Sequence, residues 1–152
     1  MKFNSSLLFA LLMFCLSCQG DFASRESKLE SCADSFANHY FNYHFDDALR
    51  FCTPESGRWL QYAATNVHEA DVEVLKTQKE GAGIVVGNIE MADDDSTALV
   101  EIQVSNYLQM DTIGTRGHIV QQATFRLPAV YREKQWKIRM EGLPRNETNG
   151  PS

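Results

Sequence analysis

The 152-residue chain has no apolar run long enough to cross a bilayer. Its longest such run, Leu7–Leu16, has ten residues, whereas a membrane-spanning helix needs about 20. Positive charge is also scarce, because 14 Lys and Arg stand against 20 Asp and Glu, for a net charge of −6. Nucleic acids and anionic lipid surfaces bind clustered positive charge. The balance therefore argues against nucleic acid as a partner.

Motifs that carry familiar site chemistry are missing as well. There is no Gly-rich phosphate loop and no Ser/His/Asp arrangement at motif spacing. His39 and His44 are five residues apart, which places them on different sides of a helix. The acidic run at 93–95 lacks the spaced ligands and closing Glu of a calcium loop. We expect neither a metal nor a cofactor.

What the sequence does contain is an export pattern at its start. Lys2 precedes the apolar run Leu7–Leu16, and Ser17-Cys18-Gln19-Gly20 closes it. A positive start, a short apolar middle and a small-residue exit are typical of a secretory signal peptide. One interpretation is plain secretion, with cleavage after Gly20.

The Ser17-Cys18 pair after the apolar run also resembles the lipobox of bacterial lipoproteins, although Leu16 lies one place later than in the usual pattern. The resemblance implies a signal peptide over 1–17, a lipidated Cys18 that attaches the protein to a membrane, and a short tether over 18–26. Because Gln19 stands where Asp would retain the protein in the inner membrane, it also implies the outer membrane, facing the periplasm.

Two further cysteines, Cys32 and Cys52, follow the predicted signal. An exported protein can keep a disulfide, and these residues approach each other if the first helix turns back near 42–44. The closed loop would have 21 residues, worth ~3 kcal/mol in the chain-entropy model. The alternative is two free cysteines that fill small gaps in the core. Both interpretations stay open.

Three helices are predicted in the first half of the chain. Ser27-Lys28-Leu29-Glu30 fits a capping box, and apolar residues at helical spacing continue that helix to about 43. Asp46 or Asp47 can cap a short helix through 51. Thr53-Pro54-Glu55 starts a third helix that reaches about 66.

The apolar period then changes from 3.6 to 2. Val72 and Val74 alternate with charged residues, and longer alternating segments follow over 84–91, 98–110, 119–131 and 136–140. Short turns between consecutive strands indicate an antiparallel meander with one apolar face. Residues 143–152 are predicted to form a loose tail.

The helices and the apolar sheet face must cover each other, which predicts an α+β domain with N-terminal helices in the concave face of a curved antiparallel sheet of four to five strands. Three features occur in order: Phe36-x3-Tyr40-Phe41, Cys52-Thr53-Pro54-Glu55, and a closing Trp-x-Ile strand. They resemble the nuclear-transport-factor-2-like superfamily, and within it small lipoproteins of Gram-negative bacteria. The resemblance covers about 27–142.

The resemblance implies that any catalytic group would lie inside the cone formed by sheet and helices. Such groups could come from His39, Tyr40, Tyr43, His44, Asp46, Asp47, Tyr107 and His118. Because no inward strand position carries an acid, we predict no catalytic residue. Five aromatic residues are predicted either to line a cavity for an apolar ligand or to fill the core: Phe36, Tyr40, Trp59, Phe125 and Trp136.

These observations favour a lipid-anchored envelope protein with a non-catalytic accessory domain. The domain would bind a protein partner or a small ligand, as a homodimer or with another envelope protein. One alternative is a pocket enzyme of isomerase, dehydratase or hydrolase type. The other is a purely structural envelope protein.

Overall fold

The computed structural model describes residues 16–110 and 116–149, and side chains over 20–110 and 116–148. The predicted signal peptide over 1–17 therefore lies almost entirely outside the described residues, and so does the side chain of Cys18. The helices are α2 (Leu16–Phe41), α3 (Phe45–Ala48), α4 (Gly57–Thr65) and α5 (Glu69–Thr77). Short 3₁₀ turns cover Leu49–Phe51, Pro54–Ser56 and Glu147–Asn149.

The strands β1 (Gly83–Met91), β2 (Thr97–Gln109), β3 (His118–Arg132) and β4 (Gln135–Ile138) form one antiparallel sheet in the order β1-β2-β3-β4. The predicted alternation is confirmed on the inner face. Val100, Ile102 and Val104 of β2 are at most 1% exposed, and so is Phe125 of β3, which pairs with Ile102. Alternate residues share a face of a strand, so the core lies on this side of the sheet.

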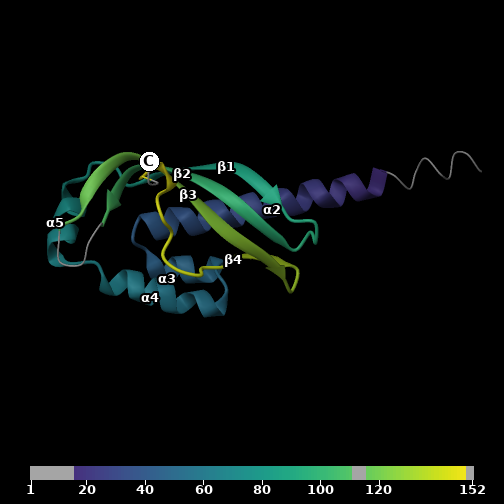
Figure 1. Cartoon of the computed structure of the whole chain (residues 1–152), viewed down its shortest axis with the longest axis horizontal. Coiled ribbons are helices and arrows are strands. Elements are labelled where there is room, and N and C mark those ends of the chain that lie inside the picture. The colour runs from purple at the N-terminus through teal and green to yellow at the C-terminus, as the bar shows by residue number, and fades with distance from the viewer. Residues whose placement is uncertain (1–15, 111–115, 150–152) are drawn as a thin grey trace, which may run out of the picture.

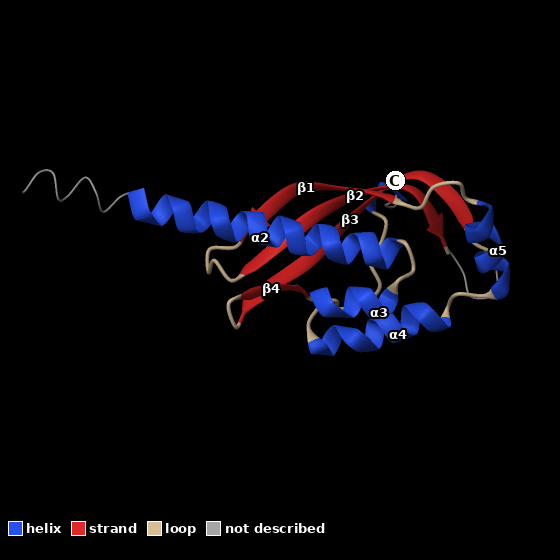
Figure 2. Ribbon diagram, turned by 180° about the vertical axis from the view of Figure 1, so that it is seen from behind, coloured by secondary structure: helices blue, strands red, loops and turns tan. Residues whose placement is uncertain are grey.

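The curved sheet covers the helices, with α2 lying across its concave face and α3 and α4 beyond it (Figures 1 and 2). The core between these layers contains Leu29, Phe36 and Phe41 from α2 and Ile138 from β4. The structure thus confirms the α+β class and places the helices against one face of a four-stranded sheet.

The first helix begins earlier than predicted. The helix does not start at the predicted capping box over 27–30, because α2 is continuous from Leu16. The residues predicted as a tether, 18–26, are part of this helix. No proline interrupts this stretch. Arg25 also ties it to the domain: its guanidinium lies 4.2 Å from the centre of the Tyr131 ring and donates to the carbonyl of Asp95 at 2.6 Å. Within 16–110 and 116–149, no helix is both long and apolar enough to cross a bilayer.

The segment around Val72 and Val74 forms helix α5 rather than a strand. A capping box starts it. The backbone N–H of His68 donates to Asp71 Oδ2 at 2.9 Å, and the backbone N–H of Asp71 donates to the His68 carbonyl at 3.0 Å. Two valines separated by one residue fit a single helical turn as well as a strand, so the alternation was too short to decide.

Part of the segment predicted to be a loose tail contacts β3 where it is described. Beyond β4, the open edge of β3 is covered by the chain after Ile138. Arg139 N donates to the Pro128 carbonyl at 2.8 Å, and Thr124 N donates to Asn146 Oδ1 at 3.3 Å. Exposed strand edges are commonly covered in this way.

Candidate functional site

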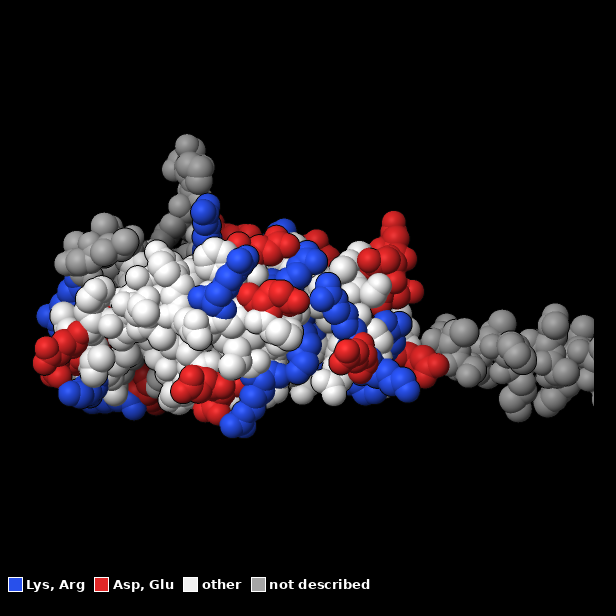
Figure 3. All heavy atoms as spheres, turned by 90° about the horizontal axis from the view of Figure 1, so that it is seen from below, with Lys and Arg blue, Asp and Glu red and all other residues white. Residues whose placement is uncertain are grey.

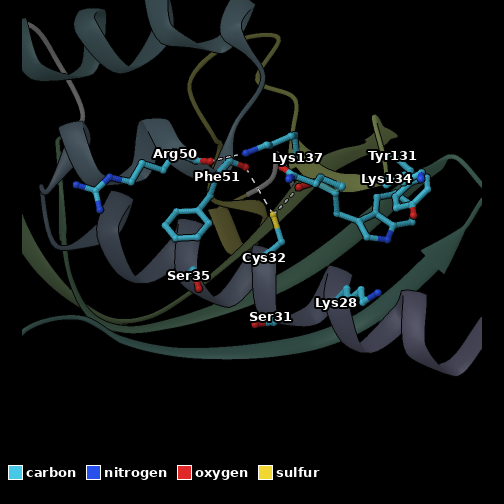
Figure 4. A pocket seen from close by; sticks show the side chains of 11 residues that line it. Lys28, Ser31, Cys32, Ser35, Arg50, Phe51, Tyr131, Lys134 and Lys137 are labelled. Atoms are coloured by element: carbon cyan, nitrogen blue, oxygen red, sulfur yellow. Dashed lines mark hydrogen bonds between the residues drawn. The ribbon is translucent and has the colours of Figure 1, made fainter.

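A groove of about 320 Å³ lies between α2, the 3₁₀ turn at 49–51 and the β3–β4 hairpin (Figure 4). It is open to solvent, and its lining combines cations, hydroxyls and aromatic rings. The lining residues are Lys28, Ser31, Cys32, Ser35, Arg50, Phe51, Tyr131, Lys134, Gln135, Trp136 and Lys137.

One wall of the groove is a single face of α2. Lys28, Ser31, Cys32 and Ser35 follow one another at spacings of three, one and three, which keeps all four on one side of a helix. Leu29 lies about 100° further around the helix than Lys28 and is fully buried in the core. The packing of Leu29 therefore turns the polar face of α2 toward the groove.

The opposite wall is the β3–β4 hairpin. Arg132 pairs with Gln135 across a two-residue turn, in which Glu133 and Lys134 both have positive φ angles of 52° and 65°. This is the backbone of the primed turns that match the twist of a hairpin. The left-handed backbone is unfavourable for residues other than glycine. The turn that places Lys134 at the groove therefore lowers the free energy of unfolding.

The groove is positively charged although the chain is acidic. The ammonium of Lys137 donates to the carbonyl of Arg50 at 2.6 Å, and the guanidinium of Arg50 lies 3.2 Å from the Asp47 carboxylate. Among the described residues, Lys28 and Lys134 have no carboxylate partner, and no Asp or Glu lines the groove. The groove therefore attracts anions.

Cys32 lies at the floor of the groove as a protonated thiol. Its Sγ is 3.2 Å from the carbonyl of Trp136 and 3.6 Å from that of Phe51 (Figure 4). Burial raises the pKa of the Cys32 thiol to about 11, and the nearby charge of Lys137 only partly opposes this. Only the thiolate is a good nucleophile or metal ligand, so Cys32 is inert near neutral pH.

Cys52 is a buried thiol whose Sγ lies 3.5 Å from the carbonyl of Leu49, and burial raises its pKa as well. Both Cys32 and Cys52 are free thiols in the structure. Their disulfide, and the lipidation of Cys18, stay predictions.

Trp136 carries a buried hydrogen-bond donor beside the groove. The residue is 4% exposed, and its buried Nε1 has no acceptor within the part of the chain that the structure describes. A buried donor without a partner costs about 1–3 kcal/mol.

The other aromatic residues predicted as cavity lining lie elsewhere. Phe36 stacks on Tyr40 at 5.6 Å between ring centres, and Phe125 packs against Phe41 at 4.5 Å, all within the core. Trp59 is half-buried on α4 beside Tyr62, 6.5 Å between ring centres. Among the five, Trp136 alone lines this groove.

The candidate acid–base groups mostly have structural surroundings. His39 stacks on Phe51 at 5.7 Å between ring centres. The hydroxyl of Tyr43 donates to the Leu108 carbonyl at 2.8 Å. Burial, and then the proximity of Tyr107, raises the pKa of both Tyr40 and Tyr43, which remain protonated. Within 16–110 and 116–149, no three His, Cys, Asp or Glu side chains are grouped in a way that could hold a metal.

A buried carboxylate that the sequence did not single out belongs to Asp71, which is 1% exposed. Its Oδ1 accepts from Gly117 N at 2.8 Å, and its Oδ2 accepts from His68 N and lies 3.6 Å from His68 Nδ1. Burial raises the pKa of Asp71, but these hydrogen bonds and the imidazole outweigh burial and lower it below its usual value. We call Asp71, His68 and Gly117 the Asp71 site.

A second hollow, of about 370 Å³, lies between α3 and α4 and is lined by residues that include Phe45, Leu49 and Leu60. From below, α4 and its surroundings show a broad surface with few charges (Figure 3). Tyr62 and Leu49 are 47% and 48% exposed there. The lining of this hollow also includes the charged residues Asp46 and Arg58 and the amide of Gln61.

Sequence reasoning missed the groove because its four cations come from positions 28, 50, 134 and 137. Only the last two are neighbours in sequence. The hairpin at 132–135 was predicted, and it was the one signal that placed Lys134 at a fixed point on the surface.

No protein-family model matches the chain, and no curated protein matches it. Among solved structures, it is similar to the intermembrane space region of the chloroplast protein ARC6, with 16% identity and a TM-score of 0.38 over 77% of this chain and 88% of that one. It is also similar to an NTF2-like protein involved in plasmid conjugation, with 12% identity and a TM-score of 0.40 over 84% of this chain and 50% of that one. Both TM-scores lie below 0.5, so neither similarity assigns a family or a function.

Proposed function

We infer that the chain is a lipid-anchored accessory protein of the cell envelope whose domain binds a protein partner without catalysing a reaction. The groove beside α2 carries this proposal. Its walls supply cations and hydrogen-bond donors, while its Cys32 thiol is held protonated. Such a lining can bind and orient a ligand, while the raised pKa of the Cys32 thiol makes it a poor nucleophile near neutral pH.

The predicted anchor and the groove belong to the same helix. Cys18 and Lys28 are ten residues apart within α2, which corresponds to about 15 Å at 1.5 Å per residue. A lipid on Cys18 would therefore hold the groove close to the membrane surface. A partner that binds the groove would be recruited to that surface.

The anchor is tested by labelling cells with an alkyne analogue of palmitate. We expect label on the full-length protein and on the C32S variant, and none on C18S. The C18S protein should also move from the membrane fraction to the soluble fraction. Label that persists on C18S, or a native product that still begins at Met1, would contradict the anchor.

Partner binding is tested separately, by placing a photo-crosslinking amino acid at Ser35 in the groove. The control carries the same amino acid at Lys79, an exposed residue outside the groove. We expect a discrete crosslinked species from position 35 and none from position 79. Equal patterns from both positions would argue against a binding role for the groove.

A further inference from the structure

We propose that the groove beside α2 binds an extended acidic segment of a protein partner. The proposal rests on the proposed function and names the chemistry of the partner.

The first observation is that the groove offers donors and no carboxylate. Lys28 and Lys134 supply ammonium groups without a carboxylate partner among the described residues, and Arg50 adds a guanidinium that is paired with Asp47 at 3.2 Å. The Trp136 indole N–H lies buried beside them and has no acceptor there. Lysine and arginine side chains and the indole can only donate. The matching ligand is rich in acceptor oxygens and carries negative charge.

The second observation is that the cations are spread out rather than convergent. Figure 4 shows Arg50 at one end of the view and Lys28 and Lys134 toward the other. A segment with several carboxylates along its length could contact each cation in turn.

The third observation separates a peptide from a longer polyanion. The whole chain carries a net charge of −6, so a nucleic acid that extended beyond the groove would meet repulsion. A short segment contacts only the positive part of the surface. The rings of Phe51 and Tyr131, which are half-buried in the lining, supply apolar surface for its side-chain carbons and backbone.

The experiment measures fluorescence anisotropy of dye-labelled hexaglutamate with the full-length protein in detergent. The test variant is K28E/K134E. The matched control is K76E/K79E, which has the same net charge and alters two exposed lysines outside the groove. Unlabelled hexaglutamine and inorganic phosphate serve as competitors, and sedimentation with phosphatidylglycerol vesicles is measured in parallel.

We expect hexaglutamate to bind and added salt to weaken it. K28E/K134E should weaken binding by about tenfold or more, while K76E/K79E should change it by less than about twofold. Hexaglutamine should not compete. Equal losses in both variants, no binding of hexaglutamate, or displacement by inorganic phosphate alone would overturn the proposal. Vesicle binding without hexaglutamate binding would overturn it in favour of lipid.

Failure of the acidic-segment proposal can be distinguished from failure of the proposed function. Lipid label on Cys18 and a crosslink from position 35 would still support an anchored accessory protein, with a partner of other chemistry. Loss of those two results, with hexaglutamate binding intact, would instead remove the envelope setting and keep the groove.

Discussion

The groove beside α2 and the Asp71 site both concentrate polar groups on one domain, and they differ in how those groups are satisfied. At the Asp71 site, both carboxylate oxygens accept backbone N–H groups, from Gly117 and His68. In the groove, Lys28 and Lys134 have no carboxylate partner among the described residues, and the buried Trp136 indole N–H beside them has no acceptor there.

The difference separates a structural role from a binding role. A buried polar group whose hydrogen bonds are all made within the chain holds elements together. Asp71 joins the start of α5 to the chain that enters β3. The exposed ammonium groups of Lys28 and Lys134 have no carboxylate partner among the described residues, so they are available to a ligand. The predictions below test this assignment of roles.

The largest effect is expected from D71A. The substitution leaves the N–H groups of Gly117 and His68 without their acceptor in a buried place, so we expect a loss of about 3 kcal/mol in the free energy of unfolding. The measurement is urea denaturation followed by circular dichroism. D93A, at an exposed turn, should change stability by less than about 0.5 kcal/mol. Similar losses in the two variants would remove the structural role of Asp71.

Acidic pH should reduce the contribution of Asp71 to the free energy of unfolding. The pKa of Asp71 is lower in the folded protein than in the unfolded chain, where it is about 3.9. The stabilisation is therefore complete above about pH 4 and is lost as the pH falls through the lower, folded pKa. We expect the stability gap between wild type and D71A to narrow below about pH 4. A gap that stays constant into stronger acid would show that hydrogen bonding to the carboxylate does not cause it.

The strands and the site differ in how far the sequence could predict them. Val100, Ile102 and Val104 alternate within one strand, so their inward face follows from local spacing. The groove depends on Lys28 and Lys134, which only tertiary packing brings to one place. No local sequence pattern predicts that these two lysines lie close together.

The expectations for α5 and for the C-terminal tail also differ from the structure, because both depend on contacts that no standard local pattern shows. Asp71 caps α5 together with His68, a pair outside the usual Ser/Thr and Glu capping box, so a helix was read as a strand. Asn146 holds the tail on β3 through its side chain. Asn146 is a polar residue near the chain end, and the sequence alone does not show that it contacts the edge of β3.

K134G should stabilise the protein moderately and weaken hexaglutamate binding. Lys134 has a φ of 65°, which costs an L residue roughly 1–2 kcal/mol, while glycine adds about 0.5–1 kcal/mol of unfolded-state entropy. We expect a net gain of up to about 1 kcal/mol in urea denaturation. K79G, at a residue without a positive φ, should bring no gain. A K134G variant that gains stability and binds equally well would mean that the strained turn does not serve the groove.

The smallest stability effect is expected from W136F. The smaller ring leaves a cavity that costs about 1 kcal/mol, but the substitution also removes a buried N–H without an acceptor, which returns about 1 kcal/mol. The two contributions nearly cancel in urea denaturation. Hexaglutamate binding should change by less than about twofold, because the buried Nε1 is not exposed to the groove. A W136F protein that loses several kcal/mol of stability would place Trp136 among the structural groups, beside Asp71, and the contrast between the two regions would fail at that residue.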